Sequence, residues 1–231
     1  MRLSHERVTR RRLLCALIAL FVPLVLIGNG VHVLAHPWFV GAELGRMRAD
    51  PYGMPEADRR RLADAALDSI VPWGGGDRLL REARLASGGP AFDAKERRHL
   101  HSVRGYVLGL YLINAVGLVA LAALFAAGRS RRLARDGLAA GAAWTLALAA
   151  FVGVYVAVNP VSFLGGFHRF FFAGDSWRFA DTETLRRLFP DAFWSDTALV
   201  LGGLVAAQAA VLLACCGQAI RLAPRTAAHA R

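Results

Sequence analysis

Cysteine is scarce in this sequence: 231 residues include three, Cys15, Cys215 and Cys216, and all of them fall inside long apolar runs. None can reach the polar segments between those runs to form a disulfide, and their spacing matches no metal site. A thiol in such surroundings acts as a small hydrophobic side chain. The sequence also lacks the Gly-x-Ser-x-Gly turn that presents a nucleophilic serine. Disulfide frameworks and serine or cysteine nucleophiles are therefore not indicated.

Acidic residues are the minority charge, with 17 Asp and Glu against 28 Lys and Arg, so that the formal net charge is +11. Many of the arginines lie in the short segments that flank the apolar runs. They are Arg2, Arg7, Arg10, Arg11, Arg12, Arg129, Arg131, Arg132, Arg135, Arg221, Arg225 and Arg231. Basic residues in short loops stay on the cytoplasmic side and are attracted to anionic lipid heads. The excess positive charge thus needs no nucleic acid as a partner.

Apolar residues make up 55% of the chain and gather in four runs, 13–35, 105–127, 138–158 and 198–220. Each run has about the 20 residues that cross a hydrocarbon core as a helix. We therefore expect a single all-α membrane domain with four transmembrane helices. The basic flanks place both termini and the middle turn in the cytoplasm, and segments 36–104 and 159–196 outside. The first run is longer than a signal-peptide core, so we interpret it as an uncleaved anchor.

The first outer segment, 36–104, predicts a small extracytoplasmic subdomain. A helix should begin at Pro55, because Leu62, Leu67 and Ile70 form one apolar stripe at helical spacing. After it, 79–86 and 91–93 are interpreted as short strands or extended pieces, separated by a Ser-Gly-Gly-Pro turn.

The second outer segment is dominated by aromatic side chains, which prefer the membrane–water interface. Ten rings lie between residues 163 and 194: Phe163, Phe167, Phe170, Phe171, Phe172, Trp177, Phe179, Phe189, Phe193 and Trp194. His168 lies among them, with Arg169 and Asp175 close in sequence. We expect Phe167, Phe171 and Arg169 to bind substrate, and Asp175 and Trp177 to support the site.

A second candidate histidine, His99, precedes the second apolar run. A helix there would place Glu96 one turn before it, where the carboxylate could accept a hydrogen bond from His99. Because a short turn joins the second and third runs, those helices should be antiparallel neighbours, which brings His99 and His168 to the same end. Two imidazoles and a carboxylate permit acid–base chemistry. A metal held with His101 is the alternative, but His99 and His101 diverge on a helix, and we assign neither a metal nor a cofactor.

Three motifs resemble a known family: ERRHLHSV before the second run, FHRFFFAGDSW, and DTETLRRLFPDAFW. Together they are similar to the bacterial four-span proteins that include the lipoprotein intramolecular transacylase. Leu100 and Ser102 stand where the family pattern has methionine and aspartate. A carboxylate at the site would then have to come from Glu96 or Asp175.

The resemblance implies an enzyme of the bacterial inner membrane, part of the cell envelope, with its active site outside the cytoplasm. Such an enzyme moves the sn-2 acyl chain of a diacylglyceryl-modified lipoprotein onto the α-amino group of its N-terminal cysteine, giving the lyso-form lipoprotein. The partners of such an enzyme are these lipoproteins and membrane lipids. The resemblance also implies His99 and His168 as the catalytic pair. Two alternatives stay open: a non-enzymatic membrane scaffold or lipid-binding protein, and an acyltransferase or hydrolase acting between separate lipids.

Overall fold

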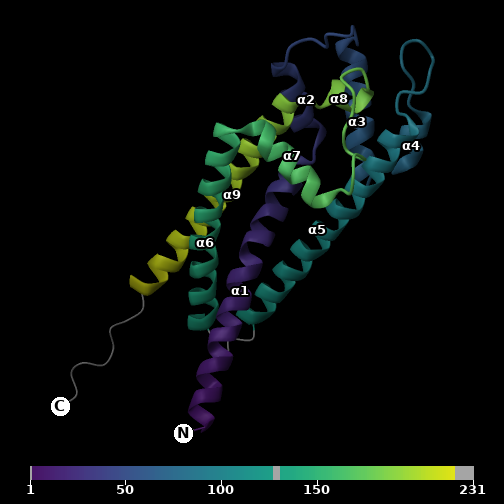
Figure 1. Cartoon of the computed structure of the whole chain (residues 1–231). Helices are drawn as coiled ribbons and strands as arrows, with labels where there is room; N and C mark the ends of the chain where they lie inside the picture. Colours follow the sequence, from purple (N-terminus) through teal and green to yellow (C-terminus); the bar gives the residue numbers. More distant parts are fainter. Residues whose placement is uncertain (1, 127–130, 222–231) are drawn as a thin grey trace, which may run out of the picture. The chain divides into compact units, whose positions relative to one another are not determined.

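The computed structural model of this chain describes residues 2–126 and 131–221 (Figure 1). Residues 127–130 and 222–231 lie outside that range, and with them part of the predicted cytoplasmic turn and tail, including Arg129, Arg225 and Arg231. The described elements are helices: α1 (Arg2–Leu34), α2 (Pro37–Arg46), α3 (Glu56–Ile70), α4 (Asp77–Glu82), α5 (Ala94–Ala126), α6 (Arg131–Val158), α7 (Pro160–Phe171), α8 (Thr184–Leu188) and α9 (Asp191–Arg221).

Four of these helices, α1, α5, α6 and α9, are long and apolar enough to cross a membrane. They contain the four apolar runs of the sequence, and many of their large side chains, such as Phe151 and Val119, are exposed. Exposed apolar side chains on a helix of this length are suited to contact with lipid. The predicted all-α fold with four transmembrane helices is confirmed.

The first of two compact units comprises residues 1–28, 113–151 and 202–231. Here α1 approaches α5 and α6 closely at small residues: a side chain added at Gly117 would meet Val25, and one at Gly141 would meet Val22. Small residues allow such close backbone approach between membrane helices. The Asn114 side chain adds a buried hydrogen bond of 2.8 Å to the carbonyl of Val25.

The second unit comprises residues 29–112 and 152–201 and contains α2, α3, α4, α7 and α8. Helix α3 packs on α2, α4 and α8, with Leu62, Leu80 and Leu188 fully buried. The apolar stripe predicted for the helix after Pro55 is the face that α3 buries. This small core holds α4, which precedes His99 in sequence, and α8, which follows His168.

The strands expected at 79–86 and 91–93 do not form within the described residues. Residues 77–82 make the short helix α4, supported by Arg81–Asp77 and Arg78–Glu82 ion pairs at helical spacing. An isolated antiparallel bridge between Arg84 and Pro90 follows, closed by a turn at Gly88, whose φ is +85°. A hairpin this short has too few residues for a ladder.

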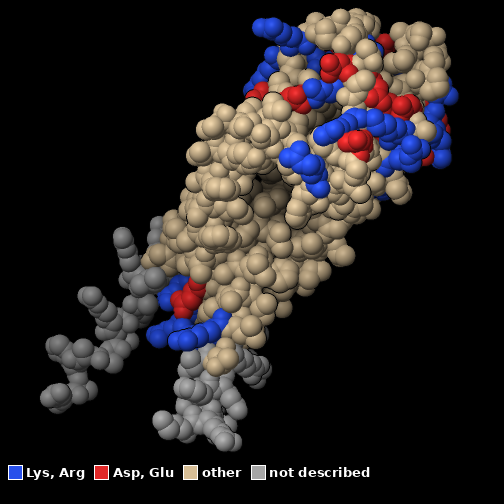
Figure 2. Space-filling view, viewed as in Figure 1, with Lys and Arg blue, Asp and Glu red and all other residues tan. Residues whose placement is uncertain are grey.

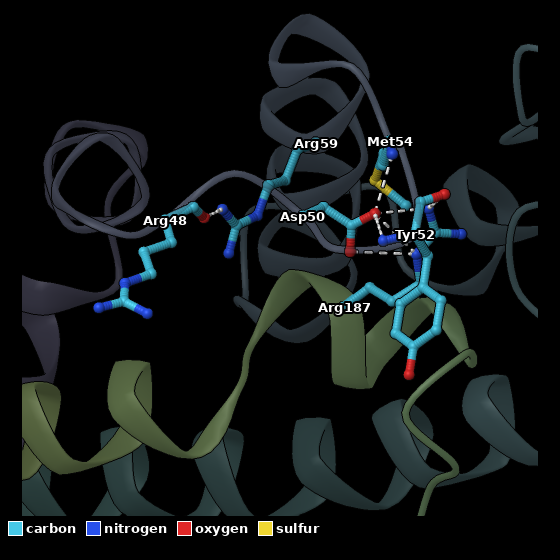
Figure 3. Close-up of polar contacts among 6 residues, drawn as sticks. All are labelled: Arg48, Asp50, Tyr52, Met54, Arg59 and Arg187. Carbon is cyan, nitrogen blue, oxygen red and sulfur yellow. Dashed lines mark hydrogen bonds and ion pairs between the residues drawn. The ribbon is translucent and has the colours of Figure 1, made fainter.

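A buried ion pair joins the two outer segments inside the second unit (Figure 3). The Asp50 carboxylate is fully buried and accepts hydrogen bonds from the backbone N–H groups of Tyr52 and Met54, at 3.1 and 2.8 Å. The Arg187 guanidinium of α8 lies 2.8 Å from the same carboxylate. Burial alone would raise the pKa of Asp50, but the hydrogen bonds and charge of Arg187 outweigh it and lower that pKa. Asp50 therefore stays ionised.

Replacing Asp50 by alanine should destabilise the fold strongly, because Arg187 and two backbone donors lose their acceptor inside the protein. Loss of one partner of a buried pair costs about 3 kcal/mol or more of unfolding free energy. Thermal unfolding in detergent micelles measures it. The matched control Glu56→Gln removes the exposed pair with Arg60 and should change stability by less than about 1 kcal/mol. Equal effects of the two variants would contradict the assignment.

Candidate active site

His168 is presented by α7, which begins with a strong local signal. The Asn159 side chain caps the helix by accepting a hydrogen bond of 3.1 Å from the N–H of Ser162, and Pro160 occupies the first turn. Asn-Pro fits both the end of a membrane helix and the start of a new one, and here it starts α7. Nδ1 of His168 lies 2.8 Å from the carbonyl of Leu164. Since a carbonyl only accepts, Nδ1 carries the proton and Nε2 is the unprotonated nitrogen of the neutral ring.

His99 lies on the first turns of α5, and its ring centroid is 6.3 Å from that of His168. Phe172 contacts both imidazoles, with centroids 4.6 Å from His99 and 5.8 Å from His168. Trp177 stacks on His168 at 4.8 Å, and Phe179 packs its edge against His99 at 5.3 Å. The structure thus brings together the two histidines that the sequence singled out, inside an aromatic cluster.

Two polar atoms of this cluster are buried without a hydrogen-bond partner among the described residues: Nδ1 of His99 and Nε1 of Trp177. Buried polar groups are nearly always satisfied, so unpartnered ones need an explanation. Both atoms belong to side chains that pack around His168. They are suited to a substrate group or a water molecule that enters the cluster.

Burial in this cluster lowers the pKa of His168, although the carbonyl of Leu164 and the charge of Asp191 act in the opposite direction. Asp191 begins α9 and is held by two charge-assisted hydrogen bonds from Arg186, one of them 2.8 Å long. Neither Asp191 nor Arg186 is among the site residues predicted from the sequence. Their role depends on a fold that returns the start of α9 toward α7, which no local pattern encodes.

Glu96 does not orient His99 as the sequence analysis expected. One of its oxygens accepts from the N–H of Asp93 at 2.8 Å, in a reciprocal capping box at the start of α5. The other accepts a buried hydrogen bond of 2.7 Å from the N–H of Leu185 in α8. Beside it, the Thr184 hydroxyl donates to the carbonyl of Ala91. Both Glu96 oxygens are thus used in joining the start of α5 to α8, which is a positioning role.

The remaining predicted residues divide into two groups. Phe167 and Phe171 lie on α7 beside the cluster, with their rings 4.8 Å apart and Phe167 half-exposed. Asp175 is exposed and pairs with Arg178 at 3.2 Å instead of with a histidine. Arg169 is also exposed and folds back along α7 toward Gly165.

No group of three or more His, Cys, Asp and Glu side chains forms a candidate metal site in the described part of the chain. His101, the third ligand of the alternative metal site, is exposed. What the arrangement offers chemically is a neutral imidazole with a free Nε2 beside a second imidazole, in apolar surroundings. That combination suits proton transfer.

Comparisons with known proteins agree with this picture. The family model for the lipoprotein intramolecular transacylase Lit matches residues 80–194. An uncharacterised protein of Aquifex aeolicus is 25% identical over 192 residues, which cover 82% of this chain and 86% of that protein. The in meso structure of the membrane integral lipoprotein intramolecular transacylase Lit from Bacillus cereus has a TM-score of 0.73 at 13% identity, over 93% of this chain and 99% of that one. A variant of it with one histidine replaced by arginine has a TM-score of 0.68 at 12% identity, over 95% of this chain and 96% of that one.

The fold and the site define a multi-pass, all-α membrane protein with two histidines in one aromatic cluster. Its predicted resemblance to the lipoprotein intramolecular transacylase family is confirmed, and residues 80–194 carry it. This resemblance supports an enzyme of the acyltransferase type.

Alanine at Glu96 should destabilise the second unit, because the N–H groups of Leu185 and Asp93 lose their acceptor. The cost of such unsatisfied donors is about 1–3 kcal/mol of unfolding free energy each. Thermal unfolding of the full chain in micelles measures it, with Glu82→Ala as the control, since Glu82 is exposed in a surface pair on α4. An unchanged unfolding temperature for Glu96→Ala would refute the positioning role.

Because burial lowers the pKa of His168, its imidazole should become half-protonated below pH 6.5, the ordinary value. The unfolded chain then binds this proton more readily than the folded one, so stability should fall as the pH drops below about 6.5. ¹⁵N NMR of histidine-labelled protein reads the midpoint, and the signal lost in His168→Asn assigns it. A midpoint above 6.5 would contradict the burial argument.

Proposed function

We propose that this protein is a lipoprotein intramolecular transacylase that uses His99 and His168 for acid–base catalysis. It moves the sn-2 acyl chain of the diacylglyceryl group to the α-amino group of the modified N-terminal cysteine. The observation that carries the proposal is the meeting of the two imidazoles in an aromatic cluster, inside the stretch that the family model matches.

The first proton transfer falls to His168 in this proposal. An α-amino group has a pKa of about 8 and must lose a proton before its nitrogen can attack. Nε2 of His168 has a lone pair available, since the ring proton is on Nδ1, and its lowered pKa keeps the ring neutral near pH 7. The amine nitrogen then bonds to the sn-2 carbonyl carbon and gives a tetrahedral oxyanion.

The second proton transfer completes the exchange. The bond between the acyl carbon and the sn-2 glyceryl oxygen breaks, and that oxygen takes the proton that His168 removed from the amine. The His99 imidazole relays this proton, accepting it on one ring nitrogen and donating from the other, so that both rings return to their neutral form. One amide forms, one ester breaks, and the products are the N-acyl chain and a free glyceryl hydroxyl on the same molecule. Because donor and acceptor share one substrate, proximity replaces a second binding step, and no acyl-enzyme is required.

The surroundings fit a lipid substrate. Phe167 and Phe170 are exposed on α7 and offer apolar surface for acyl chains. We further propose that the site faces outward from the bacterial inner membrane. Arg11, which pairs with Asp136 at 2.8 Å, and Arg135 belong to the basic flanks that the positive-inside rule places in the cytoplasm.

The test is mass spectrometry of the N-terminal peptide of a reporter lipoprotein, made in a bacterial host that lacks its own N-acylating enzyme. The intact protein should convert the diacylglyceryl peptide to the N-acyl, monoacylglyceryl form. His99→Asn and His168→Asn should each lower conversion at least about 100-fold, the scale of lost acid–base catalysis. His36→Asn is the control, because His36 is exposed and caps α2, where asparagine is favoured.

An unchanged peptide in cells that contain membrane-inserted protein would refute the transacylase. Acyl transfer to another lipid, or release of free fatty acid, would replace it with an intermolecular acyltransferase or a hydrolase. Full conversion by both histidine variants would refute the catalytic pair.

A further inference from the structure

A second face of α5 carries a basic group that the histidine site does not use. Arg98 and His101 lie about one turn apart on this face, and both are exposed. With Asp77 of α4, they line a hollow of about 420 Å³ on the second unit. Figure 2 shows charged side chains gathered over α3, α4 and the first turns of α5.

Most neighbouring charges are already paired. Asp77 lies 3.0 Å from Arg81 and 3.8 Å from Arg97, so its charge is shared between them. Arg104 donates to the carbonyls of Ser69 and Val71 at the end of α3. Arg98 has no acidic partner among the described residues. Its guanidinium therefore remains available to an anion from outside the protein.

Toward the C-terminal end of α5, the face that carries Arg98 has glycines, which present no side chains. Gly105 and Gly109 follow at helical spacing, and a side chain built on either would meet nothing within 4 Å. Leu112 continues the face and is 65% exposed. We call this stretch of α5, which has no side chains at Gly105 and Gly109 and continues to Leu112, the furrow.

The distances suit a lipid. Gly105 starts the apolar run, and Arg98 precedes it by seven residues, or about 10 Å along the helix at 1.5 Å per residue. The head-group layer of a bilayer occupies roughly the 5–7 Å outside the hydrocarbon core. A long arginine side chain can bend to keep its charge at that depth.

We propose that this face of α5 binds one anionic phospholipid. Its phosphate lies against Arg98 and His101, and one acyl chain lies in the furrow of Gly105 and Gly109. Glycines four residues apart can also pack against a second membrane helix. Two copies of this face would bring unpaired Arg98 side chains together, so charge favours the lipid. The proposal does not depend on acyl transfer at His99 and His168.

The experiment is native mass spectrometry of the full chain in detergent, titrated with phosphatidylglycerol, phosphatidylcholine or inorganic phosphate. Phosphatidylglycerol should be retained in preference to phosphatidylcholine. Arg98→Gln should weaken its binding about five-fold, the share of one basic residue at a lipid surface. Its control is Arg60→Gln, which removes an exposed arginine of α3.

Gly109→Leu tests the furrow separately, because the new side chain fills it without meeting other protein atoms. It should weaken phosphatidylglycerol binding, whereas Gly153→Leu, at an equally open glycine of α6, should not. Equal retention of the two phospholipids, or no effect of Arg98→Gln, overturns the proposal. Competition by inorganic phosphate with no effect of Gly109→Leu would indicate a site for a soluble anion instead. A changed oligomeric mass in Gly109→Leu with unchanged lipid binding would indicate an interface between copies.

Discussion

The hydrogen bond from Leu185 to the Glu96 carboxylate is the contact on which the candidate site depends most. Glu96 is on α5, one turn before His99, and Leu185 is on α8, which follows the aromatic segment along the chain. Joining them closes the segment that contains His168 and Trp177 over the face of α5 that carries His99. Asp50 also holds α8, through Arg187 (Figure 3). Two carboxylates therefore bind a helix of five residues.

This arrangement separates the groups that hold the site from those that can react in it. Among the described residues, the buried carboxylates of Asp50 and Glu96 accept hydrogen bonds from backbone or arginine donors, and none of these bonds involves an imidazole. Aromatic rings surround the histidines, and cations lie over two of these rings: Lys95, 4.9 Å from the centroid of Phe179, and Arg178, 5.3 Å from that of Trp177. Low polarity keeps His168 neutral, and the rigid supports outside the cluster keep the two rings within reach of one substrate.

The features that the sequence predicted correctly are those whose cause is local. Apolar runs of about 20 residues define membrane helices by length alone, and the short connection between the second and third runs predicts that His99 and His168 lie at one end. The role of Glu96 could not be predicted, because its partner lies 89 residues away in sequence. Asp191 was not predicted either, because its effect on His168 depends on the fold and not on its short-range pair with Arg186. Helix α7 differs, since the Asn159 cap and Pro160 were visible but suit a helix start as well as a chain exit.

Helix α7 buries none of its residues, and Phe170 on it is 82% exposed. Some of its rings pack against the protein, such as Phe171 against Tyr106 and Phe163 against Tyr155, but much of its apolar side stays exposed. Exposed apolar side chains of this kind are suited to contact with the hydrocarbon of a bilayer. The position of His168 therefore depends partly on the lipid bilayer. The fluidity and thickness of that bilayer should influence the geometry of the histidine pair.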